Sequence, residues 1–180
     1  RLNEYIETNH LLNETQFGFR KGYSTTEASF VLYALAEYLK SKKKKLFCMF
    51  VDFQKAFDSI WRVGLWSKLI NYNISGKLLN VIKNMYSNIK SCVAFDGKNS
   101  DFFGCFTGLR QGENLSPILF SLYLNDLEHF FTESCESNID LSDDLVVGVF
   151  KIVTILYADD TVIFAENEND LQQLANSFLE

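Results

Sequence analysis

The amino-acid sequence predicts an α+β fold in which one antiparallel sheet carries helices packed on one face. Stretches with apolar residues at helical spacing alternate with short apolar runs rich in Phe and Val. Turn signals at Asp96-Gly97 and at residues 158–160 separate pairs of these runs, as expected of hairpins. The 180 residues include nine glycines and one proline, so no linker divides the chain and one compact domain is expected.

Residues 24–45 predict an amphipathic helix, because they begin with the Ser-x-x-Glu spacing of a capping box and end in four consecutive lysines. The apolar run at residues 46–53 is short and predicts a buried strand. Helical spacing returns at residues 56–61. Asp52 is therefore expected near the end of a strand.

Residues 75–89 predict the next helix, with Ser75 as its cap. Its apolar face would consist of Leu78, Ile82, Met85 and Ile89. Residues 91–95 and 102–106 follow as short strands around the Asp96-Gly97 turn. This part of the chain is thus expected to be a helix followed by a hairpin.

A further helix is expected to begin at Ser116-Pro117, where a capping residue precedes a proline at the first helical position. Its apolar face would contain Phe120, Leu124, Leu127 and Phe131. The strand-like runs that follow are residues 146–150, 152–157 and 161–165. Residues 158–160 are left as a tight hairpin connection, and a last helix is expected from Asn169 onward.

The charge of the chain is distributed unevenly, although the formal net charge is only −6. Residues 1–110 hold 16 Lys and Arg against 9 Asp and Glu, whereas residues 111–180 hold one lysine against 14 acidic residues. A basic part and an acidic part suit a protein that holds a polyanion and concentrates metal cations. The alternative is that these charges lie on solvated helix faces and that their sign has no functional meaning. The lysines at 42–45 can be a solvated helix end or a nucleic-acid contact.

The four cysteines are widely spaced and form no C-x-x-C pair, so reduced and mostly buried thiols are expected rather than a zinc site. No run approaches the roughly 18 apolar residues that a membrane span needs, and no signal-peptide core follows the first residues. We therefore expect an intracellular protein, cytoplasmic or nuclear, that is not secreted and has no membrane partner.

Asp52 and the pair Asp159-Asp160 lie in otherwise apolar, strand-like surroundings. Buried carboxylates are costly unless they are paired with cations. If the two strands are neighbours, these acids meet at one sheet edge without a nearby Lys or Arg from the second segment. Oxygen ligands without His or Cys suit Mg²⁺ or Mn²⁺, and two such ions about 4 Å apart can activate a hydroxyl and stabilise a leaving phosphate oxygen. The alternative to a shared metal site is that one acid belongs only to a hairpin turn and the other, unrelated to it, caps a helix.

Residues 108–117 form a glycine-flanked loop that leads into a helix start. Backbone N–H groups at such a place can face a phosphate or a sugar. Arg110 and Gln111 can equally be surface residues of an ordinary loop.

Three segments resemble motifs A, B and C of a reverse transcriptase, in their usual order: residues 50–58 (Phe-Val-Asp-Phe-Gln-Lys-Ala-Phe-Asp), residues 108–117, and Tyr157-Ala158-Asp159-Asp160. The Ala-Phe-Asp ending of the first segment, the alanine of the third, and the Gln-Phe-Gly-Phe-Arg-Lys-Gly stretch at residues 16–22 resemble the non-LTR (LINE-type) retrotransposon branch. The resemblance covers essentially the whole chain. It implies late helical fingers over about residues 1–45 and a polymerase palm over about residues 46–180, with the thumb and motif E absent.

By this resemblance, Asp52 and Asp159 would hold two catalytic Mg²⁺ ions, for which Mn²⁺ can substitute, and Asp160 would assist. The backbone carbonyl of Phe53 would be a further ligand. Phe57 matches the steric gate whose ring fills the space of a ribose 2′-OH, although plain core packing would also explain it. The implied nucleotide-binding residues are Lys55, Ala56, Phe57, Gln111 and Gly112. The candidates for contact with nucleic acid are Arg20, Lys21 and Arg110.

The function implied is that of an RNA-directed DNA polymerase of a non-LTR retrotransposon, a nucleotidyltransferase in which a primer 3′-OH attacks a dNTP. Its partners would be an RNA template, a DNA primer, dNTP, and missing parts of a parent polyprotein, namely the thumb and an endonuclease. A catalytically inactive, nucleic-acid-binding remnant is the main alternative. An RNA-templated RNA polymerase is a further one, against which Phe57 argues. Glu113-Asn114 departs from the family's motif B, where many relatives have a proline.

Overall fold

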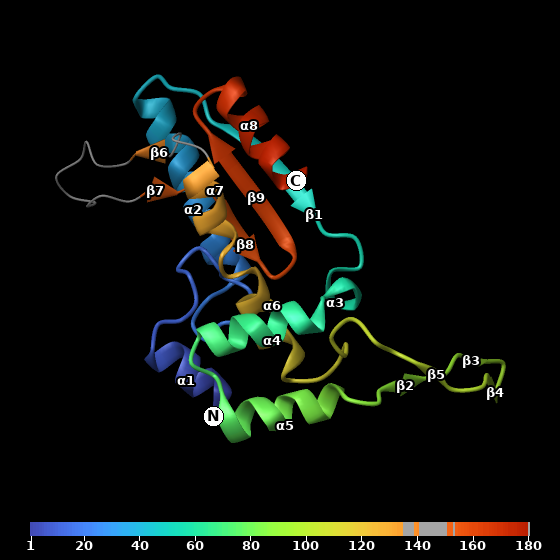
Figure 1. The fold of residues 1–180 in the computed structure, drawn as a ribbon. Helices are drawn as coiled ribbons and strands as arrows, with labels where there is room; N and C mark the ends of the chain where they lie inside the picture. The colour runs from blue at the N-terminus through green and yellow to red at the C-terminus, as the bar shows by residue number, and fades with distance from the viewer. Residues whose placement is uncertain (135–138, 141–150, 153, 180) are drawn as a thin grey trace. The chain divides into compact units, whose positions relative to one another are not determined.

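The computed structural model describes residues 1–134, 139–140, 151–152 and 154–179 (Figure 1). The predicted strand at residues 146–150 and the cysteine at position 135 lie outside these residues. The chain forms two compact units, of which the first contains residues 1–54 and 124–180 and the second contains residues 55–123. No helix among the described residues has an apolar stretch long enough to cross a bilayer.

The first unit is built on a three-stranded antiparallel sheet with the strand order β1-β9-β8 (Figure 1). Its strands are β1 (Phe47–Asp52), β8 (Thr154–Tyr157) and β9 (Asp160–Ala165). β8 and β9 form the predicted hairpin, and β1 pairs with the other edge of β9. The prediction of a buried strand at residues 46–53 is wrong in part. β1 is half buried or exposed, because it lies at the edge of the sheet in the described part of the chain.

Helices cover both faces of this sheet. On one face, Val162 and Phe164 pack against Leu35 and Leu39 of α2 (Thr25–Ser41). On the other face, Ile163 packs in a core formed with α7 (Leu127–Ser134) and α8 (Glu168–Leu179). The α+β class is confirmed, but the prediction that helices lie on one face is wrong, because the last four residues of β9, 162–165, are consecutive apolar residues and both faces of the strand need cover.

The predicted cap of α2 is present, since the Ser24 hydroxyl accepts a hydrogen bond from the Glu27 amide at 3.3 Å. The predicted helix from Ser116 is instead divided into α6 (Ser116–Leu124) and α7. Asn125 lies at the break, where its side-chain amide donates to the Leu11 carbonyl at 2.7 Å and accepts from the Asn13 amide at 2.7 Å. The first unit also contains α1 (Leu2–Thr8) and the paired strands β6 (Ile139–Asp140) and β7 (Lys151–Ile152).

The second unit is helical with one projecting hairpin. Its helices are α3 (Ala56–Ser59), α4 (Arg62–Asn71), α5 (Gly76–Tyr86) and most of α6. The hairpin consists of β2 (Lys90–Ser91), β3 (Ala94–Phe95), β4 (Lys98–Asn99) and β5 (Phe103–Gly104). Asp96 and Gly97 both have positive φ, at 47° and 71°, as in the predicted two-residue hairpin turn.

The helix predicted at residues 75–89 is α5, but its buried face differs from the predicted one. Leu79, Ile82 and Tyr86 are buried, whereas Leu78 and Met85 are 40% and 41% exposed. The Ser75 side chain makes no capping hydrogen bond. The described cysteines, Cys48, Cys92 and Cys105, are free thiols as predicted, but they are half buried rather than mostly buried, because each lies at the margin of a sheet or hairpin.

Candidate active site

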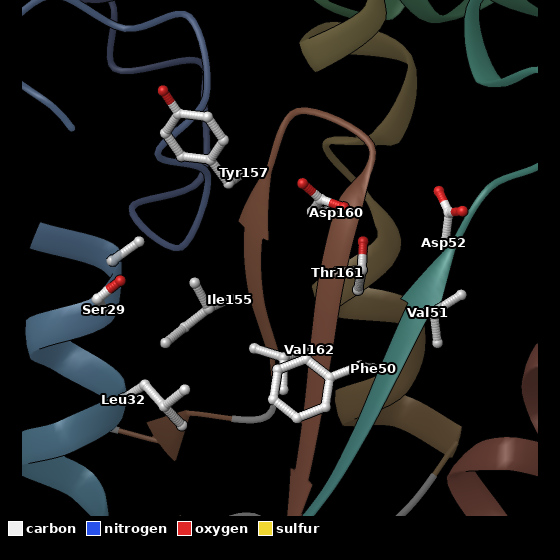
Figure 2. A pocket seen from close by; sticks show the side chains of 11 residues that line it. Ser29, Leu32, Phe50, Val51, Asp52, Ile155, Tyr157, Asp160, Thr161 and Val162 are labelled. Atoms are coloured by element: carbon white, nitrogen blue, oxygen red, sulfur yellow. The ribbon is translucent and has the colours of Figure 1, made fainter. Parts of the chain in front are cut away.

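Asp52 and Asp160 lie opposite each other at the ends of two neighbouring strands. Asp52 is the last residue of β1, Asp160 is the first residue of β9, and the two are register partners. Directly opposed residues have Cα atoms about 4.5–5.5 Å apart and side chains on the same face. Figure 2 shows both carboxyl groups at the same end of the sheet. The predicted meeting of these two acids is therefore present.

Asp159 lies in the two-residue turn that joins β8 to β9. Ala158, the first turn residue, has a φ of 59°, and Tyr157 pairs with Asp160 to close the hairpin. A positive φ at the first central residue is typical of a type II′ turn, in which glycine is the usual occupant. Ala158 therefore holds a backbone conformation that an alanine rarely adopts.

The carboxylates are more exposed than the sequence argument assumed. Asp52 and Asp160 are exposed and Asp159 is half buried, because the strand ends and the turn open to solvent. No Lys or Arg among the described residues forms an ion pair with any of the three. The electrostatic cost at this site is therefore mutual repulsion of like charges rather than desolvation.

A cavity of about 320 Å³ adjoins the two opposed carboxylates within the first unit (Figure 2). Its apolar wall comes from α2 and from the same sheet face, through Leu32, Phe50, Ile155 and Val162. Phe50 is 73% exposed even though it lies in a strand. A polar rim beside an apolar wall suits a ligand with a charged part and a flat apolar part.

The donor set suits a hard divalent cation. Within the residues that the structure describes, no three His, Cys, Asp or Glu side chains gather as a preformed metal centre. Mg²⁺ usually keeps several waters and binds one or two carboxylates together with substrate phosphates. Asp52 and Asp160 supply two exposed carboxylates on one face, so they fit an ion that arrives with a phosphorylated ligand.

In the second unit, Phe57 and Gly108 belong to two segments that are hydrogen-bonded side by side. The Leu109 amide donates to the Phe57 carbonyl at 2.7 Å, and the Gly108 amide donates to the Ile60 carbonyl at 2.9 Å. Gly108 has a φ of 78°, and a Cβ there would lie 2.6 Å from the Asp58 carbonyl oxygen. Position 108 therefore requires glycine both for its backbone conformation and for this close approach.

Phe57 is half buried, and its ring stacks on the ring of Phe120 in α6. Phe120 is fully buried, at 1% exposure. The Phe57 ring therefore has one face in the core of the second unit, and it retains an exposed part. This position is compatible both with core packing and with a gate beside the ribose 2′-OH.

Arg62 is a functional candidate that sequence reasoning missed. Its guanidinium donates to four backbone carbonyls, those of Tyr86, Cys105, Thr107 and Gly108, at 2.7–3.1 Å. Burial lowers the pKa of Arg62. The side chain thereby fixes the chain segment that leads into residues 108–112. The four carbonyls belong to two segments, the end of α5 and residues 105–108, and bonds to backbone atoms leave no signature in the sequence, so only the structure reveals this role.

The loop at residues 108–117 presents Gln111 and Gly112 to solvent. Gln111 is exposed, and Gly112 has a φ of 89° with open space where a Cβ would lie. The Arg110 guanidinium is exposed and forms an ion pair with the Glu113 carboxylate, and the hydrogen bond to Glu113 raises the pKa of Arg110. The unusual Glu113 thus has a structural partner within the loop.

Arg20 requires a correction as a nucleic-acid contact. Its side chain is 4% exposed and pairs with the carboxylates of Glu7 at 3.2 Å and Glu14 at 3.8 Å. Burial acts to lower the pKa of Arg20, but the hydrogen bond and charge of Glu7 raise it. The guanidinium also lies over the Tyr23 ring. Arg20 is therefore a structural arginine, because its donors are committed inside the protein, whereas Lys21 is exposed.

Three other predicted residues have mixed accessibility. Lys55 is exposed and has a φ of 54°, at the N-cap position of α3. Ala56 is buried at 6% exposure, so its methyl group does not face a ligand. Phe53 is half buried, with its ring 5.6 Å from that of Phe178.

Residues 1–180 match the family model described as "Reverse transcriptase (RNA-dependent DNA polymerase)". The chain is 29% identical to the RNA-directed DNA polymerase from mobile element jockey of Drosophila funebris, over 97% of this chain and 18% of that protein. It is also 29% identical to the probable RNA-directed DNA polymerase from transposon BS of Drosophila melanogaster, over 91% of this chain and 17% of that protein. The chain thus spans less than a fifth of these curated relatives.

Two solved telomerase structures share the fold. One is from Candida albicans, in complex with a fragment of telomeric RNA, with a TM-score of 0.71 at 14% identity over 99% of this chain and 32% of that chain. The other is the apo telomerase of Candida tropicalis, with a TM-score of 0.66 at 16% identity over 99% of this chain and 35% of that chain. These likenesses agree with the α+β class expected of a palm with part of the fingers.

Proposed function

This chain belongs to the reverse transcriptase (RNA-dependent DNA polymerase) family, and from that membership we propose that it carries the site at which a DNA primer is extended on an RNA template. The predicted non-LTR retrotransposon branch is confirmed by the relatives, which are RNA-directed DNA polymerases of such elements. The nucleotidyltransferase class follows from the family. The polymerase activity of a protein containing this chain is the proposal.

The observation that carries the proposal is the pairing of Asp52 with Asp160 at one end of the β1-β9-β8 sheet. Asp159 lies next to Asp160 in a turn with an uncommon backbone conformation. Two opposed, exposed carboxylates without a described cationic partner form a strong negative centre. Such a centre attracts divalent cations, and the family generally uses divalent metal ions.

Asp52 and Asp159 would hold Mg²⁺ or Mn²⁺, with Asp160 and the Phe53 carbonyl as further oxygen ligands. When bound, two such ions lower the pKa of the attacking hydroxyl and stabilise charge on the leaving phosphate oxygen. The chain's own contribution is to hold its carboxylates on adjacent strands, so that little reorganisation accompanies ligand binding. The apolar wall at Phe50 and Leu32 would exclude water beside them.

Residues of the second unit would hold the incoming nucleotide. Gln111 and Gly112 are exposed at the loop before α6, where backbone N–H groups and open space suit a phosphate or a sugar. Phe57 would exclude a 2′-hydroxyl with the exposed part of its ring. Lys55 would supply a positive charge, and Lys21 and Arg110 would contact the RNA template or the DNA primer. A thumb and an endonuclease in a longer polyprotein would complete the enzyme.

The test is primer extension on an RNA template with a DNA primer, dNTPs and Mg²⁺, for this chain and for a longer protein that contains it. Asp52→Asn should abolish extension and weaken Mn²⁺ binding, which electron paramagnetic resonance measures directly. Asp101→Asn is the matched control, because Asp101 is an exposed acid in the hairpin of the second unit, and it should change neither quantity. Extension that survives Asp52→Asn contradicts the proposal. Salt-sensitive template binding without incorporation in the longer protein would favour the inactive remnant.

A further inference from the structure

We propose that Gln16 is a positioning residue that fixes the turn carrying Asp159 and Asp160. The inference rests on the proposed function, because it assigns a task to a residue that supports the proposed metal site. The family resemblance places residues 16–22 in the fingers, near the template. The described contacts of Gln16 are instead with the hairpin that carries the two acids.

The segment at residues 15–17 runs alongside β8 and contacts it through an isolated parallel bridge. The Phe17 amide donates to the Leu156 carbonyl at 2.8 Å, and the Leu156 amide donates to the Thr15 carbonyl at 2.9 Å. Gln16 and Leu156 form a parallel bridge. The early segment is thereby held in register with the strand that leads into the turn.

The Gln16 side chain continues this contact into the turn itself. It is buried, and its Oε1 atom accepts hydrogen bonds from the Gly18 amide at 2.8 Å and from the Ala158 amide at 3.3 Å. Ala158 has the positive φ that alanine disfavours. A buried acceptor that captures its N–H group therefore stabilises the turn in a conformation that its own sequence does not prefer.

Gly18 makes the close approach possible. A Cβ at this position would lie 2.1 Å from the Ala158 nitrogen and 2.8 Å from the Ala158 Cα. Both atoms belong to the backbone, so neither can move aside like a flexible side chain. The Gly18 backbone therefore lies directly against the turn, and the Gln-x-Gly spacing at residues 16–18 is explained by contact with the two-residue connection of β8 and β9.

The position of the turn determines where the carboxylates point. Asp160 is held opposite Asp52 by the pairing of β9 with β1, whereas Asp159 has no strand partner and depends on the turn conformation alone. Residues that orient metal ligands through hydrogen bonds commonly change metal affinity or activity by about 10- to 100-fold when they are replaced. Gln16 orients Asp159 in this way, because it accepts a hydrogen bond from the amide of the preceding residue, Ala158.

The test compares the wild-type chain with Gln16→Met, which keeps the length of the side chain but lacks the acceptor, and with Gln16→Glu, which keeps the acceptor. Amide hydrogen exchange at Ala158 is measured by NMR, and Mn²⁺ affinity by electron paramagnetic resonance. Gln16→Met should accelerate exchange at Ala158 and weaken Mn²⁺ binding about tenfold. Gln16→Glu should restore slow exchange and tight binding. Gln172→Met, at an exposed position of α8, is the matched control and should change neither.

Where primer extension is measured, Gln16→Met should lower kcat and leave the KM for template-primer unchanged. Slow exchange and undiminished Mn²⁺ affinity in Gln16→Met would overturn the inference, as would a Gln16→Glu variant no better than Gln16→Met. If Gln16→Met does not fold, hydrogen exchange at the Ala158 amide of the wild-type chain is the test. Exchange as fast as that of an unprotected amide would also overturn the inference. A wild-type chain that binds Mn²⁺ without extending a primer would count against the proposed function only.

Discussion

The ring of Phe57 stacks on the ring of Phe120 with 4.5 Å between their centroids and 13° between their planes. Phe120 is buried, so the stack attaches Phe57 to the core of the second unit and restricts its rotamers. A ring held in this way can exclude a hydroxyl group at a defined place, whereas a mobile ring could move aside. The core-packing role and the gate role of Phe57 are therefore compatible.

We predict that Phe57→Val raises ribonucleotide incorporation relative to deoxynucleotide incorporation by about tenfold or more, because it opens the space of the 2′-hydroxyl. It should also lower the free energy of unfolding by about 1 kcal/mol through loss of the stack. Primer extension with NTP and with dNTP measures the first effect, and urea denaturation the second. Phe95→Val, at a residue that is 82% exposed, should change neither. An unchanged nucleotide preference in Phe57→Val would leave Phe57 as a core residue only.

We predict that Asp52→Asn stabilises the metal-free protein. The wild type opposes two like charges across β1 and β9, an arrangement that costs about 0.2–1 kcal/mol. Urea denaturation in the presence of a chelator should show the gain. Added Mg²⁺ should then stabilise the wild type by mass action and leave the variant unchanged. Equal responses of the two proteins to Mg²⁺ would contradict the assignment of Asp52 as a ligand.

We predict that Arg62→Lys lowers the free energy of unfolding by about 2–3 kcal/mol, because an ammonium group cannot replace a guanidinium that bonds four separate carbonyls. Thermal and urea denaturation measure the loss. Arg110→Lys is the control, because Arg110 is an exposed arginine that pairs within its own loop. It should leave the midpoints of thermal and urea denaturation unchanged. A stable Arg62→Lys variant would show that the segment before Gly108 is held by other contacts.

We predict a pH-dependent effect at Glu128. Burial raises the pKa of this carboxyl above its ordinary value of 4.5, although hydrogen bonds from Thr15 and Asn13 oppose the shift. The folded state therefore favours the protonated form, whose contribution to stability is complete below the ordinary pKa and is lost as the pH rises through the folded-state pKa. Glu128→Gln keeps an acceptor for the Thr15 hydroxyl and should be stabilising at neutral pH.

The stabilisation by Glu128→Gln should disappear once the pH falls below about 4, where the wild-type carboxyl is itself protonated. Urea denaturation at a series of pH values measures the difference. Glu4→Gln, at an exposed position of α1, is the control and should show no comparable pH dependence. A Glu128→Gln effect that is the same at acidic and neutral pH would contradict the raised pKa.

Local patterns predicted most elements of this fold, and the apolar, strand-like surroundings of the acids predicted that Asp52 and Asp160 would meet if their strands were neighbours. The sequence also indicates that both sheet faces are covered, because residues 162–165 are four consecutive apolar residues and do not alternate with polar ones. The break between α6 and α7 at Asn125 could not be predicted from the sequence, because neither Pro nor Gly marks it. Its cause is a pair of hydrogen bonds to residues 11 and 13.

The charged and amide side chains were the least predictable part of the site. Arg20 resembles a surface residue in the sequence, and only the convergence of Glu7 and Glu14 makes it a buried one. Arg62 and Gln16 bond to backbone atoms that are distant in sequence. Such partners depend on the finished tertiary structure, and periodicity and spacing carry no information about them.

The contact between Gln16 and Ala158 joins positions 142 residues apart in sequence, which has a consequence for the order of folding. The β8–β9 hairpin is local and can form within about 1–10 μs. Closure of so long a loop is slower, because its entropic cost precedes any gain from the contacts it makes. The hairpin therefore forms before its turn receives the Gln16 acceptor, and the geometry of the candidate site is expected to be completed in a late folding step, after most secondary structure is already in place.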